Sequence, residues 1–381
     1  MKLTQLFIDF FNSEKSGGLI LVLCTFVSIA LVNSPFQNFY LGILQYEIAE
    51  HDIVHWINDG LMVLFFLLIG LELEREIYEG ELSNVKNALL PIAGAFGGMV
   101  VPAGFYLLFN FGTATQSGAG IPTATDIAFA LGILSLLGNR VPGSLKIFLT
   151  ALAVIDDLGA IIIIAVFYTA GLIWVNLIIA LAVFVLLLVL NRLKVDNLIP
   201  YIIGGIIMWY FMLHSGVHPT ITGVLLAFAV PFRRKEGISP SGKLLHYLHK
   251  PVAYFILPLF ALANTAIIIN SSWIETLAQP VSLGIITGLV IGKPLGIALF
   301  TFLAVAAGIS SLPEDLNWRH ILGTGFLAGI GFTMSIFITL LAFDQEEIIN
   351  SSKLMVLVAS LIAGTVGFIW LKRNLKKQII E

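Results

Sequence analysis

Four charged residues lie within long apolar stretches of this 381-residue sequence: Asp126, Asp156, Asp157 and Lys293. A charged side chain at the centre of a lipid bilayer costs at least ~2.5–3.5 kcal/mol, so such residues face the interior of a helix bundle or water. A structural ion pair would explain Lys293 and one aspartate. It does not explain three acids beside one base, so we interpret the set as a buried site that binds ions.

Asp156 and Asp157 are adjacent in one predicted helix, so their side chains diverge by about 100°. The two carboxylates therefore cannot both point into the same cage. We expect one of them to face an ion site. The other would face a neighbouring helix, where it accepts Lys293.

Asp126 ends the run 122–126, Pro-Thr-Ala-Thr-Asp, which follows Gly118 and Gly120. A proline, two β-branched hydroxyl residues and an acid are unusual together in a membrane helix. They predict an interrupted helix, because bare backbone at membrane depth is tolerated only where it faces a cavity. The hydroxyl of Thr125 would then line the interruption beside Asp126.

A later apolar segment has a similar weakness. Glycines at positions 323, 325, 329 and 331 precede the run 332–335, Phe-Thr-Met-Ser. Glycines also serve close helix packing, and for these glycines alone that alternative stays open. Combined with the buried acids, they favour a transporter site built from two broken helices.

The chemistry of such a site follows from its donors. Carboxylates, carbonyls and threonine hydroxyls are hard oxygen ligands, suited to alkali or alkaline-earth cations. The same carboxylates can take protons, so Na⁺ and H⁺ would compete for one site. Competition for one site, combined with alternating access, is sufficient for antiport. The sequence contains neither a phosphate-binding loop nor a His-Glu-x-x-His metal-hydrolase motif.

The composition indicates the elements that must hold these residues. Hydrophobic residues make up 58% and charged residues 11% of the chain, whereas soluble domains have about 45–50% and about 25%. A net charge of −3 excludes nucleic-acid binding through bulk basicity. The single cysteine, Cys24, excludes a disulfide framework and a cysteine-based metal cluster. We therefore predict an all-α polytopic membrane protein.

About 20 apolar residues cross a bilayer as a helix. On that basis we predict twelve spans, at about 16–34, 56–71, 87–109, 118–138, 146–168, 172–190, 198–213, 216–232, 251–269, 281–304, 321–343 and 354–371. With this count, eighteen of the 20 lysines and arginines fall on one side of the membrane. Positive residues concentrate on the cytoplasmic side, so both termini are expected to be cytoplasmic.

The whole chain, 1–381, is expected to form a single membrane domain. Its longest polar stretches, about 34–55 and 233–250, are too short to fold alone. Residues 1–15 resemble an interfacial amphipathic helix. They do not have the basic start and small-residue end of a cleavable signal peptide.

Several motifs together closely resemble the NhaA family of bacterial Na⁺/H⁺ antiporters. The resemblance extends from about residue 10 to 375, nearly the whole chain. The motifs are Gly-Leu-Glu-Leu-Glu-Arg-Glu at 70–76, Ala-Thr-Asp-Ile-Ala-Phe-Ala-Leu-Gly at 124–132, Ala-Val-Ile-Asp-Asp-Leu-Gly-Ala-Ile at 153–161, Ser-Gly-Val-His at 215–218, Gly-Lys-Pro-Leu-Gly at 292–296 and Gly-Phe-Thr-Met-Ser at 331–335.

The resemblance implies twelve transmembrane helices that contain an inverted pair of three-helix repeats, at about 87–168 and 281–371. The fourth and eleventh helices would be discontinuous and would cross; NhaA is itself an established example of this architecture. The family extrudes cytoplasmic Na⁺ or Li⁺ in exchange for entering protons, electrogenically and with activation at alkaline pH. The implied location is the bacterial inner membrane, with Na⁺, Li⁺, H⁺ and the lipid bilayer as partners. No cofactor, enzymatic activity or nucleic-acid partner is expected.

The resemblance also implies roles for single residues. Asp157 corresponds to the main carboxylate that binds the cation or the proton, so Na⁺ or Li⁺ is expected at Asp157 and Asp156. Asp156 would exchange a salt bridge with the charge-compensating Lys293. Asp126 and Thr125 would line the helix break, where Asp126 offsets the positive helix ends.

Glu72, Arg75 and Glu76 lie at the cytoplasmic end of the second predicted span, a region that serves the pH response in the family. A solvated helix end with an i,i+3 ion pair is the alternative. His218 is a candidate for pH sensing because histidine as a residue type has a suitable intrinsic pKa. The alternative is that a histidine beside Pro219 is more often a packed or capping residue.

A homodimer is left open. In the family, dimer contacts come partly from a periplasmic β-hairpin between the first two spans. Here that connection is compact and ends in Glu47, Glu50, His51 and Asp52.

Three other function classes make different demands on the sequence. An intramembrane aspartyl protease would carry a Gly-x-Gly-Asp string, which is absent from the sequence, and has no use for Lys293. A symporter of organic anions on a similar scaffold would need a wider cavity, and it stays open. A channel is disfavoured because tight carboxylate sites suit stepwise exchange better than conduction.

Overall fold

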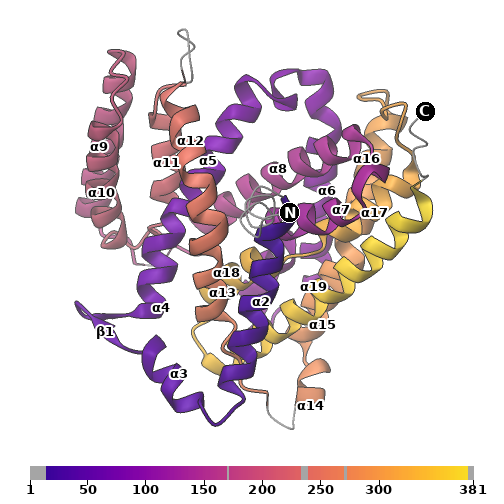
Figure 1. The fold of residues 1–381 in the computed structure, drawn as a ribbon, viewed down its shortest axis with the longest axis horizontal. Helices are drawn as coiled ribbons and strands as arrows, with labels where there is room; N and C mark the ends of the chain where they lie inside the picture. Colours follow the sequence, from indigo (N-terminus) through magenta and orange to yellow (C-terminus); the bar gives the residue numbers. More distant parts are fainter. Residues whose placement is uncertain (1–13, 170, 233–238, 270–272, 376–381) are drawn as a thin grey trace, which may run out of the picture. The chain divides into compact units, whose positions relative to one another are not determined.

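A computed structural model of the protein describes residues 14–169, 171–232, 239–269 and 273–375 (Figure 1). Most of these residues are helical. The chain divides into two compact units, each assembled from separated segments. The first unit comprises Met1–Pro35, Asn84–Ala160 and Thr265–Glu381, and the second comprises Phe36–Ser83 and Ile161–Asn264.

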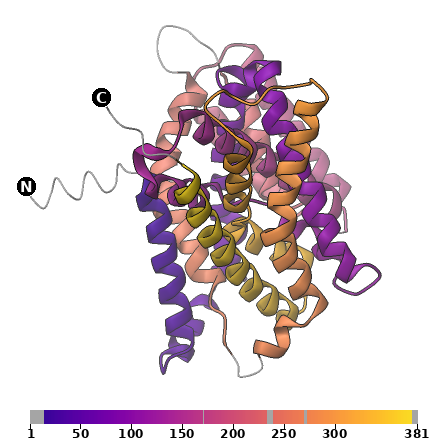
Figure 2. The ribbon, with the colours of Figure 1, turned by 90° about the vertical axis from the view of Figure 1, so that its right-hand side faces the viewer.

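The first unit holds all four charged residues that the sequence places in apolar segments. Its helices are α2 (Glu14–Val32), α6 (Val85–Asn110), η3 (Gln116–Thr123), α7 (Ile127–Leu136), η4 (Gly138–Arg140), most of α8 (Gly143–Phe167), α14 (Trp273–Leu277), α15 (Pro280–Thr287), η6 (Gly288–Gly292), α16 (Lys293–Ala306), α17 (Trp318–Ala328), α18 (Phe332–Ala342) and α19 (Glu346–Asn374). Both α15 and α17 pack against α19, the yellow helix of Figure 2.

The second unit contains the remaining helices and the only strands of the described residues. Its elements are α3 (Gln37–Leu44), β1 (Glu47–Ile48), β2 (His51–Asp52), α4 (Ile53–His55), η1 (Trp56–Leu61), α5 (Met62–Tyr78), η2 (Glu81–Ser83), α9 (Trp174–Arg192), α10 (Ile199–Leu213), α11 (Ile221–Ala229), α12 (Pro240–Pro251), η5 (Val252–Ile256) and α13 (Leu257–Asn264). The last residues of α8 also belong to it.

Seven helices of the described residues are long and apolar enough to cross a membrane, or up to nine if each of two broken pairs counts as one span. The protein is therefore a membrane protein, as its composition predicts. A helix lies in each of the twelve expected segments, but several are short, so the count of twelve stays a prediction. The interfacial helix expected at 1–15 lies outside the described residues, except that α2 begins at Glu14.

In the first unit, α6 and α16 approach each other with backbone against backbone. A Cβ added to Gly97 of α6 would collide with the carbonyl oxygen of Gly296 in α16. One added to Gly296 would collide with the carbonyl oxygen of Gly97. Small residues allow membrane helices to pack this closely, because no side chain separates them. The contact lies about one helical turn from Lys293, the first residue of α16.

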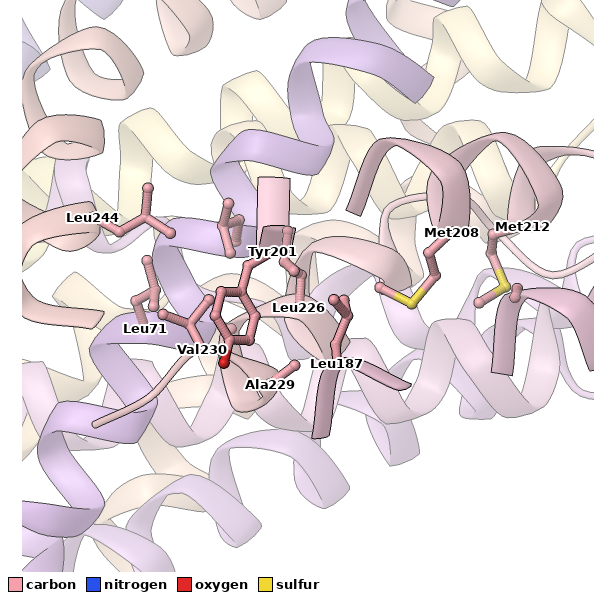
Figure 3. Packing of buried hydrophobic residues seen from close by; sticks show 12 residues of the cluster. Leu71, Leu187, Tyr201, Met208, Met212, Leu226, Ala229, Val230 and Leu244 are labelled. Atoms are coloured by element: carbon pink, nitrogen blue, oxygen red, sulfur yellow. The ribbon is translucent and has the colours of Figure 1, made fainter. Parts of the chain in front are cut away.

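The second unit has a core of buried aliphatic and aromatic side chains contributed by α5, α9, α10, α11 and α12. Figure 3 shows Tyr201, Leu226 and Leu187 meeting near its centre. The hydroxyl of Tyr201 donates a hydrogen bond to the carbonyl oxygen of Val195 at 3.0 Å, which satisfies its polar atom. In the same unit, Gly223 of α11 allows that helix to approach the backbone of α5 at Val63.

The connection before α4 forms a β-hairpin that the sequence analysis did not predict. Strands β1 and β2 pair antiparallel, with Glu47 opposite Asp52 and Ile48 opposite His51. The turn residues Ala49 and Glu50 both have positive φ, at 50° and 70°. Positive φ at both central positions is the pattern of a type I′ turn, whose twist suits a two-residue hairpin loop. Two-residue strands are too short for their sequence to show an alternating pattern.

Candidate functional site

The first interruption separates η3 from α7 in the first unit. Residues 124–126 have no helical structure, and Ala124 and Asp126 have extended ψ angles of 154° and 99°. Asp126 then caps α7, because its Oδ1 accepts a hydrogen bond from the backbone N–H of Phe129 at 2.9 Å. The helix therefore stops at the Pro-Thr-Ala-Thr-Asp run and begins again immediately after it.

The second interruption separates α17 from α18. The chain leaves α17 at Gly329, and α18 begins at Phe332 with its axis bent by 49° from that of α17. Gly331 is needed here, because a Cβ at this position would collide with the hydroxyl of Ser335. That hydroxyl donates to the carbonyl oxygen of Ile121 in η3 at 2.7 Å.

The two interruptions contact each other directly through hydrogen bonds. The backbone N–H of Asp126 donates to the carbonyl oxygen of Ile330 at 2.7 Å. The hydroxyl of Thr125 donates to the carbonyl oxygen of Ala328 at 2.8 Å. Thr333 donates to Asp126 Oδ2 from its hydroxyl at 2.5 Å and from its backbone N–H at 3.2 Å. Groups that leave the helical hydrogen-bond pattern thus find partners in the other interruption.

Asp126 consequently accepts N–H groups from the first turns of two helices, α7 and α18. Helix N-termini carry partial positive charge, which a carboxylate offsets. The side chain is 2% exposed, so water does not satisfy it. Asp126 therefore lies at the N-termini of both α7 and α18.

Lys293 and Asp156 form an ion pair in the same unit. The Nζ of Lys293 lies 2.7 Å from Asp156 Oδ2, and both side chains are fully buried. Thr125 donates its hydroxyl to the same carboxylate oxygen at 2.7 Å. Lys293 also donates to the carbonyl oxygen of Thr123, at the end of η3. The pair therefore links α8 and α16 to the first interruption.

Asp157 is 1% exposed, and Lys293 is close enough for its charge to interact with both Asp157 and Asp156. The other oxygen of Asp156, Oδ1, has no hydrogen-bond partner among the described residues. A buried carboxylate oxygen without a donor is costly unless a cation or a proton occupies it. The site thus places two adjacent carboxylates beside one ammonium group, away from bulk water.

The close packing of α6 and α16 helps to place Lys293. A Cβ at Gly98 of α6 would lie 3.7 Å from the Cε of Lys293 and 2.9 Å from Ile297 Cγ1. The glycine therefore leaves room for the lysine stem along α6. In this way a small residue of α6 contributes to the position of a charged group of α16.

Glu72, Arg75 and Glu76 all lie near the end of α5, in the second unit. Arg75 Nη2 is 3.5 Å from Glu76 Oε1, so its ion pair is with the adjacent residue. The i,i+3 pair with Glu72, which the alternative interpretation required, is not formed in the part of the chain that the structure describes. Glu76 Oε2 also accepts the backbone N–H of Glu81 at 3.2 Å.

His218 lies close to Asp59 of η1, with its Nε2 3.3 Å from Asp59 Oδ1. Its Nδ1 is 2.7 Å from the hydroxyl of Thr220. His55 Nδ1 approaches the other oxygen of Asp59 at 3.4 Å. One carboxylate therefore bridges two histidines within the second unit, and the sequence analysis missed this cluster. The i,i+4 spacing of His55 and Asp59 was the available signal.

Glu74 is a second residue that the sequence analysis missed. It is buried at 4% exposure, and its Oε2 accepts the hydroxyl of Ser241 in α12 at 2.7 Å.

Farther along α12, outside the candidate spans, burial and the charges of Arg75, His246 and Lys250 lower the pKa of His249. A lower pKa favours the neutral form of the His249 ring.

Among the described residues, no group of three or more histidine, cysteine, aspartate or glutamate side chains could hold a metal ion. Carboxylates beside threonine hydroxyls and backbone carbonyls are suited to binding a small hard cation or a proton.

Comparison with known proteins agrees with the resemblance found in the sequence. The family model described as Na⁺/H⁺ antiporter 1 matches residues 8–371. The chain is 66% identical to the Na⁺/H⁺ antiporter NhaA of Flavobacterium psychrophilum over 381 residues, which cover 100% of this chain and 99% of that protein. It is 57% identical to the Na⁺/H⁺ antiporter NhaA of Cytophaga hutchinsonii over 379 residues, 100% of this chain and 98% of that protein.

Proposed function

Because the chain belongs to the Na⁺/H⁺ antiporter 1 family, we propose that it extrudes cytoplasmic Na⁺ or Li⁺ in exchange for entering protons. The observation that carries this proposal is the buried Lys293–Asp156 pair beside Asp157. Together, Asp156 and Asp157 provide two carboxylates for a cation. Lys293 provides a positive charge that can take the place of the cation.

In the proposed mechanism, Na⁺ and H⁺ compete for Asp157 and Asp156. When a cation enters, Asp156 turns from Lys293 to the cation, and protons leave the site. When protons return, the cation is released and the Lys293–Asp156 contact forms again. The buried Asp156 Oδ1, which has no hydrogen-bond partner among the described residues, supports this exchange because it can accept either ligand. Unequal charge movement in the two directions would make the exchange electrogenic.

The interruptions of the two helices supply the polar lining and the conformational freedom for alternating access. Asp126 and Thr125 connect both interruptions, so a shift of one is transmitted to the other. We propose that these segments are the crossed fourth and eleventh helices of a twelve-helix fold with inverted repeats at about 87–168 and 281–371. That fold would form a single membrane domain over 1–381.

The pH response is assigned to the second unit. Glu72, Arg75 and Glu76 supply clustered charges at the end of α5, and His218 adds a titratable ring beside Asp59. We propose activation at alkaline pH through these groups. The proposed setting is the bacterial inner membrane with both termini cytoplasmic, and the hairpin of β1 and β2 is available to a homodimer.

Everted membrane vesicles from a strain without its own Na⁺/H⁺ antiporters test this function. Respiration acidifies the vesicles and quenches an amine dye, and added NaCl, LiCl or KCl is then tested from about pH 6.5 to 8.5. We expect dequenching by Na⁺ and Li⁺ but not by K⁺, with a response that grows with pH. The Asp157→Asn variant is expected to lose the response, because its amide neither carries charge nor exchanges a proton.

Asp344→Asn is the matched control, since it makes the same change at an exposed position of the same unit. It should respond like the parent protein. A parent protein that responds to no cation would overturn the proposed function. An active Asp157→Asn variant would overturn only the assignment of the site.

A further inference from the structure

The first turn of α18 carries the contacts that hold Asp126. An α-helix leaves the N–H groups of its first turn without partners inside the helix. Two of these groups have side-chain partners outside α18: Thr333 donates to Asp126, and Phe332 donates to the hydroxyl oxygen of Ser360 in α19 at 3.1 Å. The residue before α18, Gly331, has no side chain that could cap the helix.

Ser360 is remote from the ion site in sequence and is itself buried at 5% exposure. Phe332 and Thr333 are buried at 3% and 1%, so water does not replace a lost acceptor. The hydroxyl of Ser360 thus caps α18 from a neighbouring helix, one residue before the N–H that binds Asp126.

We propose that Ser360 is a positioning residue for the ion site: by capping α18 it sets where Thr333 presents its two donors to Asp126. This inference rests on the proposed function, because it concerns how tightly that site binds Na⁺. None of the hydrogen bonds given above joins Ser360 to Asp156 or Lys293. The effect of Ser360 on Na⁺ binding is therefore transmitted through Thr333 and Asp126.

Removal of the hydroxyl changes the contacts of Asp126. In Ser360→Ala, the buried N–H of Phe332 loses its acceptor, and the next N–H of the same turn is the one that Thr333 donates to Asp126. The start of α18 would move toward Asp126 or become less ordered, and both changes disturb the two Thr333 contacts. A hydrogen bond of this kind corresponds to about a threefold to tenfold change in an equilibrium constant.

The experiment measures dequenching against Na⁺ concentration in everted vesicles. We expect Ser360→Ala to raise the Na⁺ concentration for half-maximal response about threefold to tenfold, with a smaller change in maximal response. Ser360→Thr keeps a hydroxyl and should restore the parent value. Ser352→Ala is the control, because Ser352 is fully buried on the same helix and its hydroxyl has no hydrogen-bond partner among the described residues.

A double-mutant cycle separates positioning from general destabilisation. Thr333→Val removes the hydroxyl that donates to Asp126 but keeps the backbone N–H contact. Adding Ser360→Ala to Thr333→Val should therefore have a smaller effect than Ser360→Ala has in the parent protein, since the hydroxyl contact is already absent. The inference would be overturned if the effects of the two substitutions on the half-maximal Na⁺ concentration multiplied. It would also be overturned if Ser360→Ala had the half-maximal Na⁺ concentration of the parent protein. If the parent protein itself did not respond to Na⁺, the proposed function would fail instead. Membrane levels and melting temperature are measured for each variant, and Thr333→Val keeps the cycle informative if Ser360→Ala expresses poorly.

Discussion

Lys293 and Asp156 hold opposite charges in contact where water cannot reach them. Replacing one partner of a buried pair leaves the other charge uncompensated, which costs about 3–5 kcal/mol. We therefore expect Lys293→Ala to lower the melting temperature of the purified protein in detergent, as measured by loss of helical circular dichroism or by a thermal aggregation assay.

The matching control is the double variant Asp156→Asn/Lys293→Ala, in which both charges are absent. Its melting temperature should lie above that of Lys293→Ala, because no buried charge remains alone. An unchanged melting temperature in Lys293→Ala would contradict the pair as a stabilising contact.

At the scale of residues, the sequence predicted that a lysine meets one of the adjacent aspartates. It did not predict the contacts between side chains that are distant in the chain. Adjacent aspartates must diverge on a helix, so one of the two was expected to accept a lysine from a neighbouring helix. The structure places Lys293 on Asp156. The contacts of Asp59 with His218 and of Glu74 with Ser241 were not predicted, because the partners in each pair lie more than a hundred residues apart in the chain. Nothing local in the sequence marks such pairs.

At the scale of elements, the contact between α6 and α16 depends on the absence of side chains. Gly97→Ala would place a methyl group against the backbone of Gly296, and overpacking of this kind costs about 1–3 kcal/mol. We expect a lower melting temperature and a weaker Na⁺ response in vesicles, because Lys293 begins the helix that would be displaced.

Gly104→Ala is the control on the same helix, since a Cβ there meets no atom within 4 Å. It should behave like the parent protein or slightly better, because alanine favours helix over glycine. Equal effects of the two substitutions would show that helix propensity, and not the contact with α16, decides the outcome.

Helix positions followed from apolar length, and one interruption followed from an unusual run of residues. The structure interrupts the chain at 124–126, where the Pro-Thr-Ala-Thr-Asp run predicted it. The hydrogen bonds that join this interruption to α17 and α18 require residues about 200 positions apart. The π-helical turns of η1, η5 and η6 were also not predicted, because an extra residue in a helical turn leaves no clear compositional mark.

At the scale of the molecule, the orientation in the membrane follows from where positive charges gather. In a Cys24→Ser background, Ser311→Cys should react with an impermeant maleimide only in everted vesicles, because its loop is expected to be cytoplasmic. Asp344→Cys should react in intact cells instead. Both positions are exposed, so access and not burial decides labelling. Labelling of both from the same side would contradict twelve spans with cytoplasmic termini.

The inverted repeats remain a proposal at this scale, and the glycine contact supports them. α6 opens the first predicted repeat, and α16 belongs to the opening helix of the second. Their contact is mutual, since each glycine faces the carbonyl oxygen of the other. Mutual contacts of this kind are what a twofold axis produces.

The close contact between α6 and α16 also restricts how the protein can move. Flexible side chains between two helices can change rotamer and let the helices slide. Gly97 and Gly296 have no side chains that could adjust in this way. Tightly packed interfaces of this kind resist gradual deformation. A rocking motion that exposes the carboxylates first to one side of the membrane and then to the other would therefore move α6 and α16 together as a rigid body. Lys293, the first residue of α16, would move with this pair, and the interrupted segments would serve as the hinges.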